Sequence, residues 1–182
     1  DQEGNLFLTV VNNTVNPREG SSNLDERPGM ENSDDQRAPG NTNDLRGKIL
    51  RIHPEDDGTY TIPEGNLFPV GTEKTRPEIY TMGHRNPWRP TLDSETGYLY
   101  WGEVGPDASI DSIWGPKGYD EFNQAKGPGF FGWPYFIGNN QPYNKHDLAT
   151  NTYGAPFDVN SPVNESVNNT GLKNLPTPVV PA

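Results

Sequence analysis

The sequence contains no cysteine and no long apolar run. Without cysteine, disulfide bonds, thiolate catalysis and cysteine-ligated zinc are excluded, although the cellular compartment stays open. No stretch approaches the ~18 apolar residues that a membrane-spanning helix needs, so membrane insertion is not expected. The GxSxG pattern of serine hydrolases and the HExxH pattern of zinc proteases are also absent. These absences exclude several common classes of enzyme.

Positive charge is scarce as well. The chain has 14 lysine and arginine residues against 25 aspartate and glutamate residues, which gives a formal net charge of −11. Such a surface repels phosphate backbones, so neither nucleic-acid binding nor attraction to anionic membranes is expected. Carboxylates and backbone carbonyls suit hard cations such as calcium. The charge balance therefore favours small-molecule or cation chemistry.

Glycine and proline are abundant, with 20 and 19 residues among 182. A helical bundle does not tolerate breakers at this density. Hydrophobic residues make up only 30%, yet 10% aromatic residues argue against simple disorder. The composition predicts an all-β fold with many turns and a core rich in aromatic rings.

Alternating apolar residues and turn signals predict five strands. The polar segment 12–44 is interpreted as a long surface insertion, and 144–182 as an irregular tail of a single domain spanning 1–182. The chain begins with a turn that leads directly into a strand, which we interpret as the start of a fragment. The predicted strands are 5–11, 48–53, 78–82, 98–104 and 121–124.

The insertion carries a run of acidic residues that we interpret as a solvated face, which is the usual situation of surface charge. A second feature is an internal similarity between 1–8 and 93–100, where an aspartate and a glycine turn precede a strand. Its spacing is compatible with the repeat of a β-propeller, although such turns precede strands in any β protein. The acidic residues are Asp25, Glu26, Glu31, Asp34 and Asp35.

Three short segments contain residues that could act in catalysis or in binding a ligand. Residues 83–87 (GHRNP) place an imidazole, a guanidinium and an amide before a proline, which favours an extended or turn backbone. A strand then ends at Gly105 and Pro106 with free carbonyls, and Asp120 and Glu121 are adjacent carboxylates. By residue type alone, the first could be a loop whose arginine pairs with a carboxylate, the second an ordinary turn, and the third simply solvated.

Taken together, these segments resemble the glucose/sorbosone dehydrogenase family, whose members are soluble sugar dehydrogenases that depend on pyrroloquinoline quinone (PQQ). The resemblance covers about 1–143 and implies part of a six-bladed β-propeller, about two to three blades with long irregular loops. It rests on six motifs in one order: LRGKILRI at 45–52, PEIY at 77–80, GHRNP at 83–87, EVGP at 103–106, DE at 120–121 and GWP at 132–134.

The resemblance also implies a function: oxidation of an aldose sugar at C1 by hydride transfer to the quinone, with calcium as a Lewis acid. Arg85 would stabilise the developing oxyanion and, with Asn86, contact PQQ. The carbonyls of Gly105 and Pro106 would hold the catalytic calcium. Asp120 and Glu121 would help to bind a second, structural calcium. The implied partners are the sugar and an external electron acceptor, in a periplasmic or extracellular setting.

Several positions depart from the family pattern. The histidine base of the family lies upstream of Asp1, so this chain alone is expected to be inactive, and His84 belongs to the arginine motif. Asn12 stands where the family carries an aspartate that orients the base, and Trp88 stands where a glutamine often contacts the cofactor. The alternative hypothesis is therefore a non-catalytic β-propeller that serves as a binding module related to this family.

Overall fold

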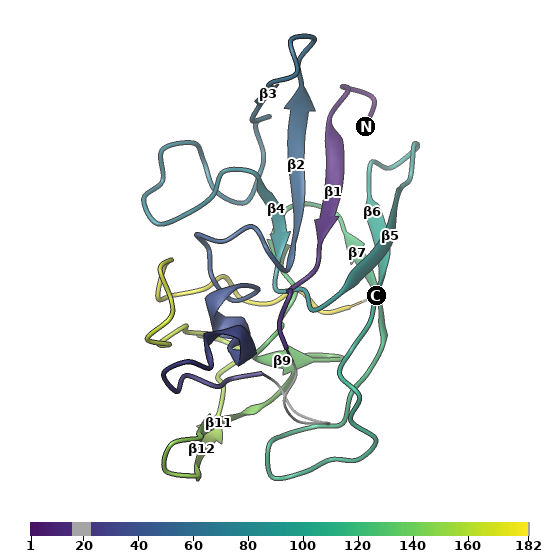
Figure 1. Cartoon of the computed structure of the whole chain (residues 1–182). Helices are drawn as coiled ribbons and strands as arrows, with labels where there is room; N and C mark the ends of the chain where they lie inside the picture. Colours follow the sequence, from purple (N-terminus) through teal and green to yellow (C-terminus); the bar gives the residue numbers. More distant parts are fainter. Residues whose placement is uncertain (16–22, 182) are drawn as a thin grey trace.

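The computed structural model describes residues 1–15 and 23–181 (Figure 1). In this part of the chain there are twelve strands, two short 3₁₀ helices and no α-helix, which confirms the predicted all-β fold. Within the same residues no helix is long and apolar enough to cross a membrane. All five predicted strands are present, each within one residue of its predicted bounds.

The first sheet has the order β1-β2-β4-β8, with β3 added to the end of β2. The pairs β1–β2 and β2–β4 are antiparallel, but β8 pairs with β4 in parallel, which the sequence did not predict. The chain crosses from the second sheet to reach β8, so it arrives in the same direction as β4. The strands are β1 (Leu6–Val10), β2 (Lys48–Pro54), β3 (Tyr60–Thr61), β4 (Ile79–Met82) and β8 (Gly129–Phe130).

The second sheet is the antiparallel meander β5-β6-β7. Its edge strand β5 contains two prolines, a register shift and one residue with φ of 49°, Arg89, so sequence patterning did not reveal it. Prolines are tolerated here because an edge strand pairs on one side only. The strands are β5 (Pro87–Leu92), β6 (Leu99–Glu103) and β7 (Glu121–Ala125).

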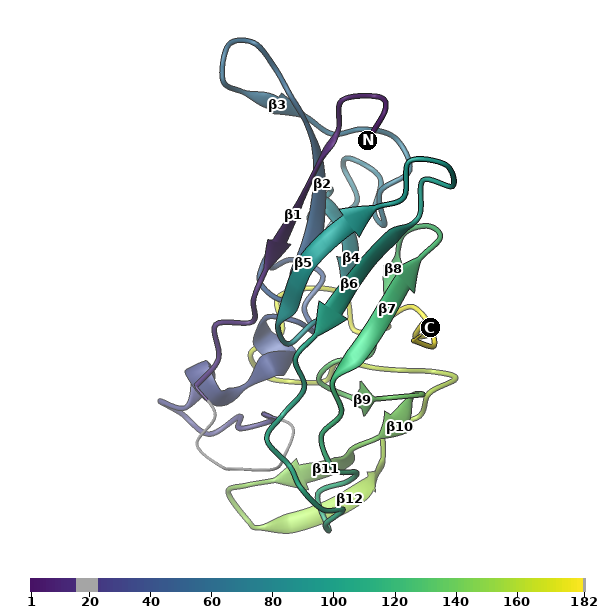
Figure 2. The same ribbon diagram turned by 90° about the vertical axis from the view of Figure 1, so that its right-hand side faces the viewer.

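The two sheets pack against each other, and β1 lies beside β5 (Figure 2). Between them lies a cluster of buried side chains in which Tyr80 of β4 and Trp101 of β6 are the largest members of the two sheets. Phe131 closes this cluster, and its ring makes an edge contact with Trp101 at 4.8 Å. Aromatic packing of this kind holds both sheets in one fixed arrangement.

The insertion is not the solvated surface loop that the sequence predicted. Residues 16–22 lie outside the described residues, and the rest folds into η1 (Glu31–Ser33) and η2 (Asp35–Arg37). Asp25, Asp34 and Asp35 have exposed fractions of only 1%, 1% and 0%. Asp34 and Asp35 are buried because side chains that are distant in sequence supply hydrogen bonds, as when Ser166 donates to Asp34 at 2.6 Å. Asp25 instead pairs with Arg27 at 2.7 Å.

Burial raises the pKa of Asp35 to about 6, from an ordinary value of 3.8. The native state therefore holds this proton more tightly than the unfolded state. Stability is expected to fall by about 2–3 kcal/mol as pH rises from about 4 to 6. In Asp35→Asn, the free energy of unfolding should not show this fall between about pH 4 and 6. Urea unfolding at several pH values measures the free energy of unfolding of both proteins. If it depends on pH in the same way in the wild type and the variant, Asp35 is not the group responsible.

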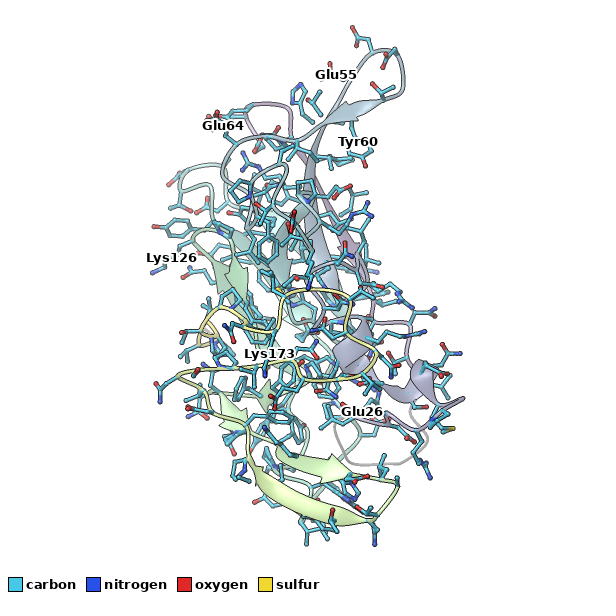
Figure 3. The ribbon with its side chains drawn as sticks, turned by 90° about the vertical axis from the view of Figure 1, so that its left-hand side faces the viewer. Glu26, Glu55, Tyr60, Glu64, Lys126 and Lys173 are labelled. Carbon is cyan, nitrogen blue, oxygen red and sulfur yellow. The ribbon has the colours of Figure 1, made fainter. Side chains whose placement is uncertain are left out.

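The end of the chain is partly ordered into strands, contrary to the irregular tail predicted for 144–182. An antiparallel hairpin of two strands begins it, and the segment after the hairpin packs Phe157 and Leu175 into a second core cluster. Figure 3 shows Glu26 and Lys173 in this lower part of the molecule, far from Tyr60 in the β2–β3 hairpin. The remaining strands are β9 (Phe136–Ile137), β10 (Gln141–Pro142), β11 (Asn144–Asp147) and β12 (Thr152–Pro156).

Candidate functional site

The segment 83–87 forms a tight connection between the two sheets. Gly83 follows β4 with φ of 81°, and a β-carbon at this position would lie 2.4 Å from the Phe130 ring. Only glycine fits both the backbone conformation and the available space. The chain turns here and presents His84, Arg85 and Asn86 before it enters β5.

The carboxylate of Glu103, at the end of β6, holds this connection in place. Its Oε1 accepts hydrogen bonds from the backbone N–H groups of Arg85 and Asn86, both at 2.7 Å. Its Oε2 accepts the indole N–H of Trp101 at 3.1 Å and lies 3.1 Å from Nδ1 of His84. Glu103 is 6% exposed, so these contacts compensate for the desolvation of its charge.

His84 is completely buried and supports the structure of the segment. Its Nε2 lies 2.8 Å from the hydroxyl of Thr81, opposite the contact with Glu103. Its ring packs against Trp101 and Phe131, with centroid distances of 5.2 and 5.5 Å. Both ring nitrogens are therefore used inside the protein. This agrees with the interpretation that His84 belongs to the arginine motif and is not the base.

Arg85 and Asn86 line a surface hollow of about 280 Å³, which we call the Arg85 hollow. Asn12, which follows β1, faces it from the other side, and its backbone N–H donates to the carbonyl of Arg85 at 3.0 Å. The structure thus brings Asn12 next to the arginine motif, a neighbourhood that the sequence did not predict. Trp88 does not line the hollow and is 57% exposed. The other described residues that line the hollow are Val11, Asn13, Thr14, Val15 and Asn23.

The guanidinium of Arg85 keeps most of its hydrogen-bonding capacity. Its Nη1 donates to the carbonyl of Val104 at 3.1 Å, which orients the side chain. No aspartate or glutamate of the described residues forms an ion pair with it. The simple alternative, a surface arginine paired with a carboxylate, thus has no support among the described residues. A cation with free donors suits an anionic or carbonyl oxygen.

The residues proposed for catalytic calcium lie just beyond β6. The backbone N–H of Gly105 donates to Oδ1 of Asp120 at 3.0 Å, so one residue from each predicted calcium site lies at the same place. The carbonyl of Pro106 accepts the N–H of Ala108 at 2.8 Å and packs against Gly118, where a β-carbon would lie 1.8 Å from its oxygen. This carbonyl is thus engaged within its own loop.

Glu121 is also engaged within the protein. Its carboxylate accepts the backbone N–H of Gly138 at 2.6 Å and the side-chain amide of Asn123 at 3.2 Å. Burial raises its pKa to about 7. Within residues 1–15 and 23–181, no group of three acidic or histidine side chains is arranged to hold a metal ion. These contacts do not form a calcium cage, so the calcium sites stay a prediction and no chemical step is derived through them.

A family model described as Glucose / Sorbosone dehydrogenase matches residues 28–167, which is more than half of the chain. The chain belongs to the glucose/sorbosone dehydrogenase family. Members of this family are sugar dehydrogenases, and therefore oxidoreductases. The resemblance seen in the sequence is confirmed.

The chain is also similar to individual proteins. The HIPL2 protein of Arabidopsis thaliana is 33% identical over 119 residues, which are 58% of this chain and 16% of that protein. A putative oxidoreductase (glucose dehydrogenase) of Thermus thermophilus is 29% identical with a TM-score of 0.52, over 85% of this chain and 35% of its own. An aldose sugar dehydrogenase of Streptomyces coelicolor, solved with PQQ bound, is 28% identical with a TM-score of 0.39, over 57% of this chain and 27% of its own.

The chain thus spans about a third or less of these members of the glucose/sorbosone dehydrogenase family. Its fold is accordingly a partial β-propeller, as predicted, with β1-β2-β4 and β5-β6-β7 as its antiparallel sheets. Sequence reasoning found Arg85 and Asn86 but missed two carboxylates behind them. Glu103 was noted only as part of the EVGP motif, and Asp35 only as one of a run of solvated acidic residues. A glutamate that ends an otherwise apolar strand was the available signal for Glu103.

Proposed function

We propose that the full-length protein carrying this chain is a PQQ-dependent dehydrogenase that oxidises an aldose sugar at C1. Membership of the glucose/sorbosone dehydrogenase family supports an oxidoreductase acting on sugars. The cofactor and the site of oxidation come from the six motifs that resemble the family, and they remain our proposal. The sugar and an external electron acceptor would be its partners, in the periplasm or outside the cell.

The observation that carries this proposal is the binding of the Arg85–Asn86 backbone by Glu103. Two hydrogen bonds to one buried carboxylate oxygen fix both residues, so their side chains reach the same hollow without reorganisation. Groups held in this way stabilise a developing charge more effectively than mobile ones. A purely structural loop would not need an arginine that faces a hollow and has no carboxylate partner in residues 1–15 and 23–181.

The residues of the Arg85 hollow would have distinct roles. Arg85 would donate hydrogen bonds to the oxygen on which negative charge develops, and Asn86 would fix the orientation of the cofactor through its amide. When bound, PQQ supplies the acceptor for the hydride. The polar hollow, with one cation and several amides, suits a flat anionic group such as this quinone.

The proposal is tested by reconstituting the full-length protein. With PQQ, calcium and glucose, it is expected to reduce an artificial dye acceptor, and without PQQ the rate should fall to background. Repeating the assay with calcium removed by a chelator tests the predicted metal separately. Absence of both PQQ binding and dye reduction, tested with several aldoses, would contradict the proposed function.

A second candidate is the non-catalytic binding module. It is favoured by Asn12 in place of a carboxylate, and by the exposed rings of Trp88 and Phe122, which are 57% and 82% exposed. These two residues face the same side of the second sheet, since both are paired with Gly102. In that case the protein would bind a partner through this face and would not retain PQQ.

A further inference from the structure

Asp35 connects the insertion to the Arg85 hollow. Its side chain is fully buried at the start of η2. Among the described residues, its carboxylate accepts hydrogen bonds from the amide of Asn12, the hydroxyl of Thr14, the amide of Asn23 and the indole of Trp133. The contact with Trp133 is 2.8 Å long and that with Asn23 is 3.2 Å. One carboxylate therefore binds three separate parts of the chain: the segment with Asn12 and Thr14, Asn23, and Trp133.

Three of these four partners line the Arg85 hollow, namely Asn12, Thr14 and Asn23. Trp133 approaches from the core side instead, where it is 3% exposed. Asp35 itself does not line the hollow, so it stands one layer behind the surface that a ligand would meet. Its influence on that surface is exerted through the three polar side chains.

The contact with Asn12 is the most informative one. Its Nδ2 lies 3.1 Å from each of the two carboxylate oxygens. An ionised carboxylate only accepts hydrogen bonds, so the amide must turn its nitrogen toward Asp35 and its oxygen away. The backbone N–H of Asn12 is fixed at the same time by the carbonyl of Arg85. Neither the position nor the flip of this amide is free.

We propose that Asp35 is a positioning residue of the Arg85 hollow, which holds Asn12 and Asn23 by their amide nitrogens and turns the Asn12 oxygen away from itself. That oxygen accepts the backbone N–H of Thr14 at 3.4 Å and keeps a second lone pair for a ligand. This inference rests on the proposed function. It accounts for Asn12 at the position where the family pattern has an aspartate. The negative charge is not lost but lies one hydrogen bond further from the ligand.

The arrangement has a chemical consequence for what the hollow recognises. A hydroxyl or an N–H group could donate to the amide oxygen of Asn12, while an adjacent oxygen accepts from Arg85. Because Asp35 polarises the amide, this oxygen is a stronger acceptor than that of a free asparagine. A single donor–acceptor pair of this type suits the hydroxyl groups of a sugar or the base that acts on them.

Asp35→Asn is the direct test, because it keeps the size of the side chain and removes the charge. In the full-length protein with PQQ, calcium and glucose, kcat is expected to fall ~10–100-fold, the usual range for a residue that orients a ligand-binding group. KM for glucose should change less. The matched control is Asp34→Asn, an equally buried carboxylate held by Gln36, Ser166 and Asn168, away from the hollow.

The control variant should keep kcat within about twofold of the wild type even if its melting temperature falls. Equal losses of kcat in both variants would show a general structural effect and overturn the proposal. The reciprocal variant Asn12→Asp/Asp35→Asn restores an amide–carboxylate pair with its direction reversed. It is expected to recover most of kcat, and no recovery in a folded double variant would also count against the proposal.

A measurement that does not depend on enzymatic activity tests the role of Asp35 separately from the proposed function. In full-length protein with ¹⁵N-labelled asparagine, the side-chain amide of Asn12, assigned with Asn12→Ala, should be protected from hydrogen exchange. Asp35→Asn should abolish this protection and Asp34→Asn should not. If the wild type never oxidises glucose, the proposed function fails, and the amide signal alone decides whether Asp35 positions Asn12. An unchanged signal in Asp35→Asn would overturn the inference.

Discussion

Replacing Arg85 with alanine is expected to lower the kcat of PQQ-dependent glucose oxidation by about 10²–10³-fold in the full-length protein, since removal of one preorganised donor from an oxyanion site has this effect. The guanidinium is oriented by the Val104 carbonyl and is free of ion pairs among the described residues, so its donors are available. Folding should change little, because Arg85 lies at a hollow and not in the core. Steady-state kinetics and thermal unfolding measure the two effects separately.

The matched control is Arg89→Ala, four positions further along. Arg89 is exposed, and its guanidinium lies over the Trp88 ring at 5.7 Å, away from the residues that line the hollow. This variant should retain kcat within about threefold. If Arg85→Ala is as active as the control, Arg85 has no role in charge stabilisation. The binding-module hypothesis would then be the better description.

Replacing Glu103 with alanine is expected to be the most destabilising single change considered, at about 4 kcal/mol. The substitution leaves the backbone N–H groups of Arg85 and Asn86 and the indole of Trp101 without their acceptor in a buried site. Each unsatisfied buried donor costs about 1–3 kcal/mol, and partial relaxation recovers some of this. Chemical denaturation of both proteins measures the difference.

Two further variants define the origin of that loss. Glu103→Gln keeps one oxygen for the two backbone N–H groups but places an amide nitrogen near the Trp101 indole, so about half of the loss is expected. Glu95→Ala, at an exposed glutamate in the β5–β6 turn, should change stability by less than about 0.5 kcal/mol. A value near zero for Glu103→Ala would show that the 83–87 segment is held by other contacts.

The sequence was sufficient for five of the twelve strands in the described residues and for Arg85 and Asn86, which line the Arg85 hollow. Alternating apolar residues and turns mark β1, β2, β4, β6 and β7, because a strand with one buried face needs a period of two. Arg85 and Asn86 were found because a short motif before proline is a local feature. The strand β5 was missed since its prolines contradict the usual strand pattern, and only pairing with β6 makes it a strand.

The roles of the two buried carboxylates could be decided only by the tertiary structure. The sequence shows Asp35 as one member of an acidic run, and nothing local distinguishes it from exposed Glu26. Its burial depends on donors such as the Trp133 indole, which is 98 residues away in the chain. Glu103 likewise depends on a segment 17 to 19 residues before it. A charge is stable inside a protein only where folding brings enough donors to it, and the identity of those donors is a property of the fold and not of the local sequence.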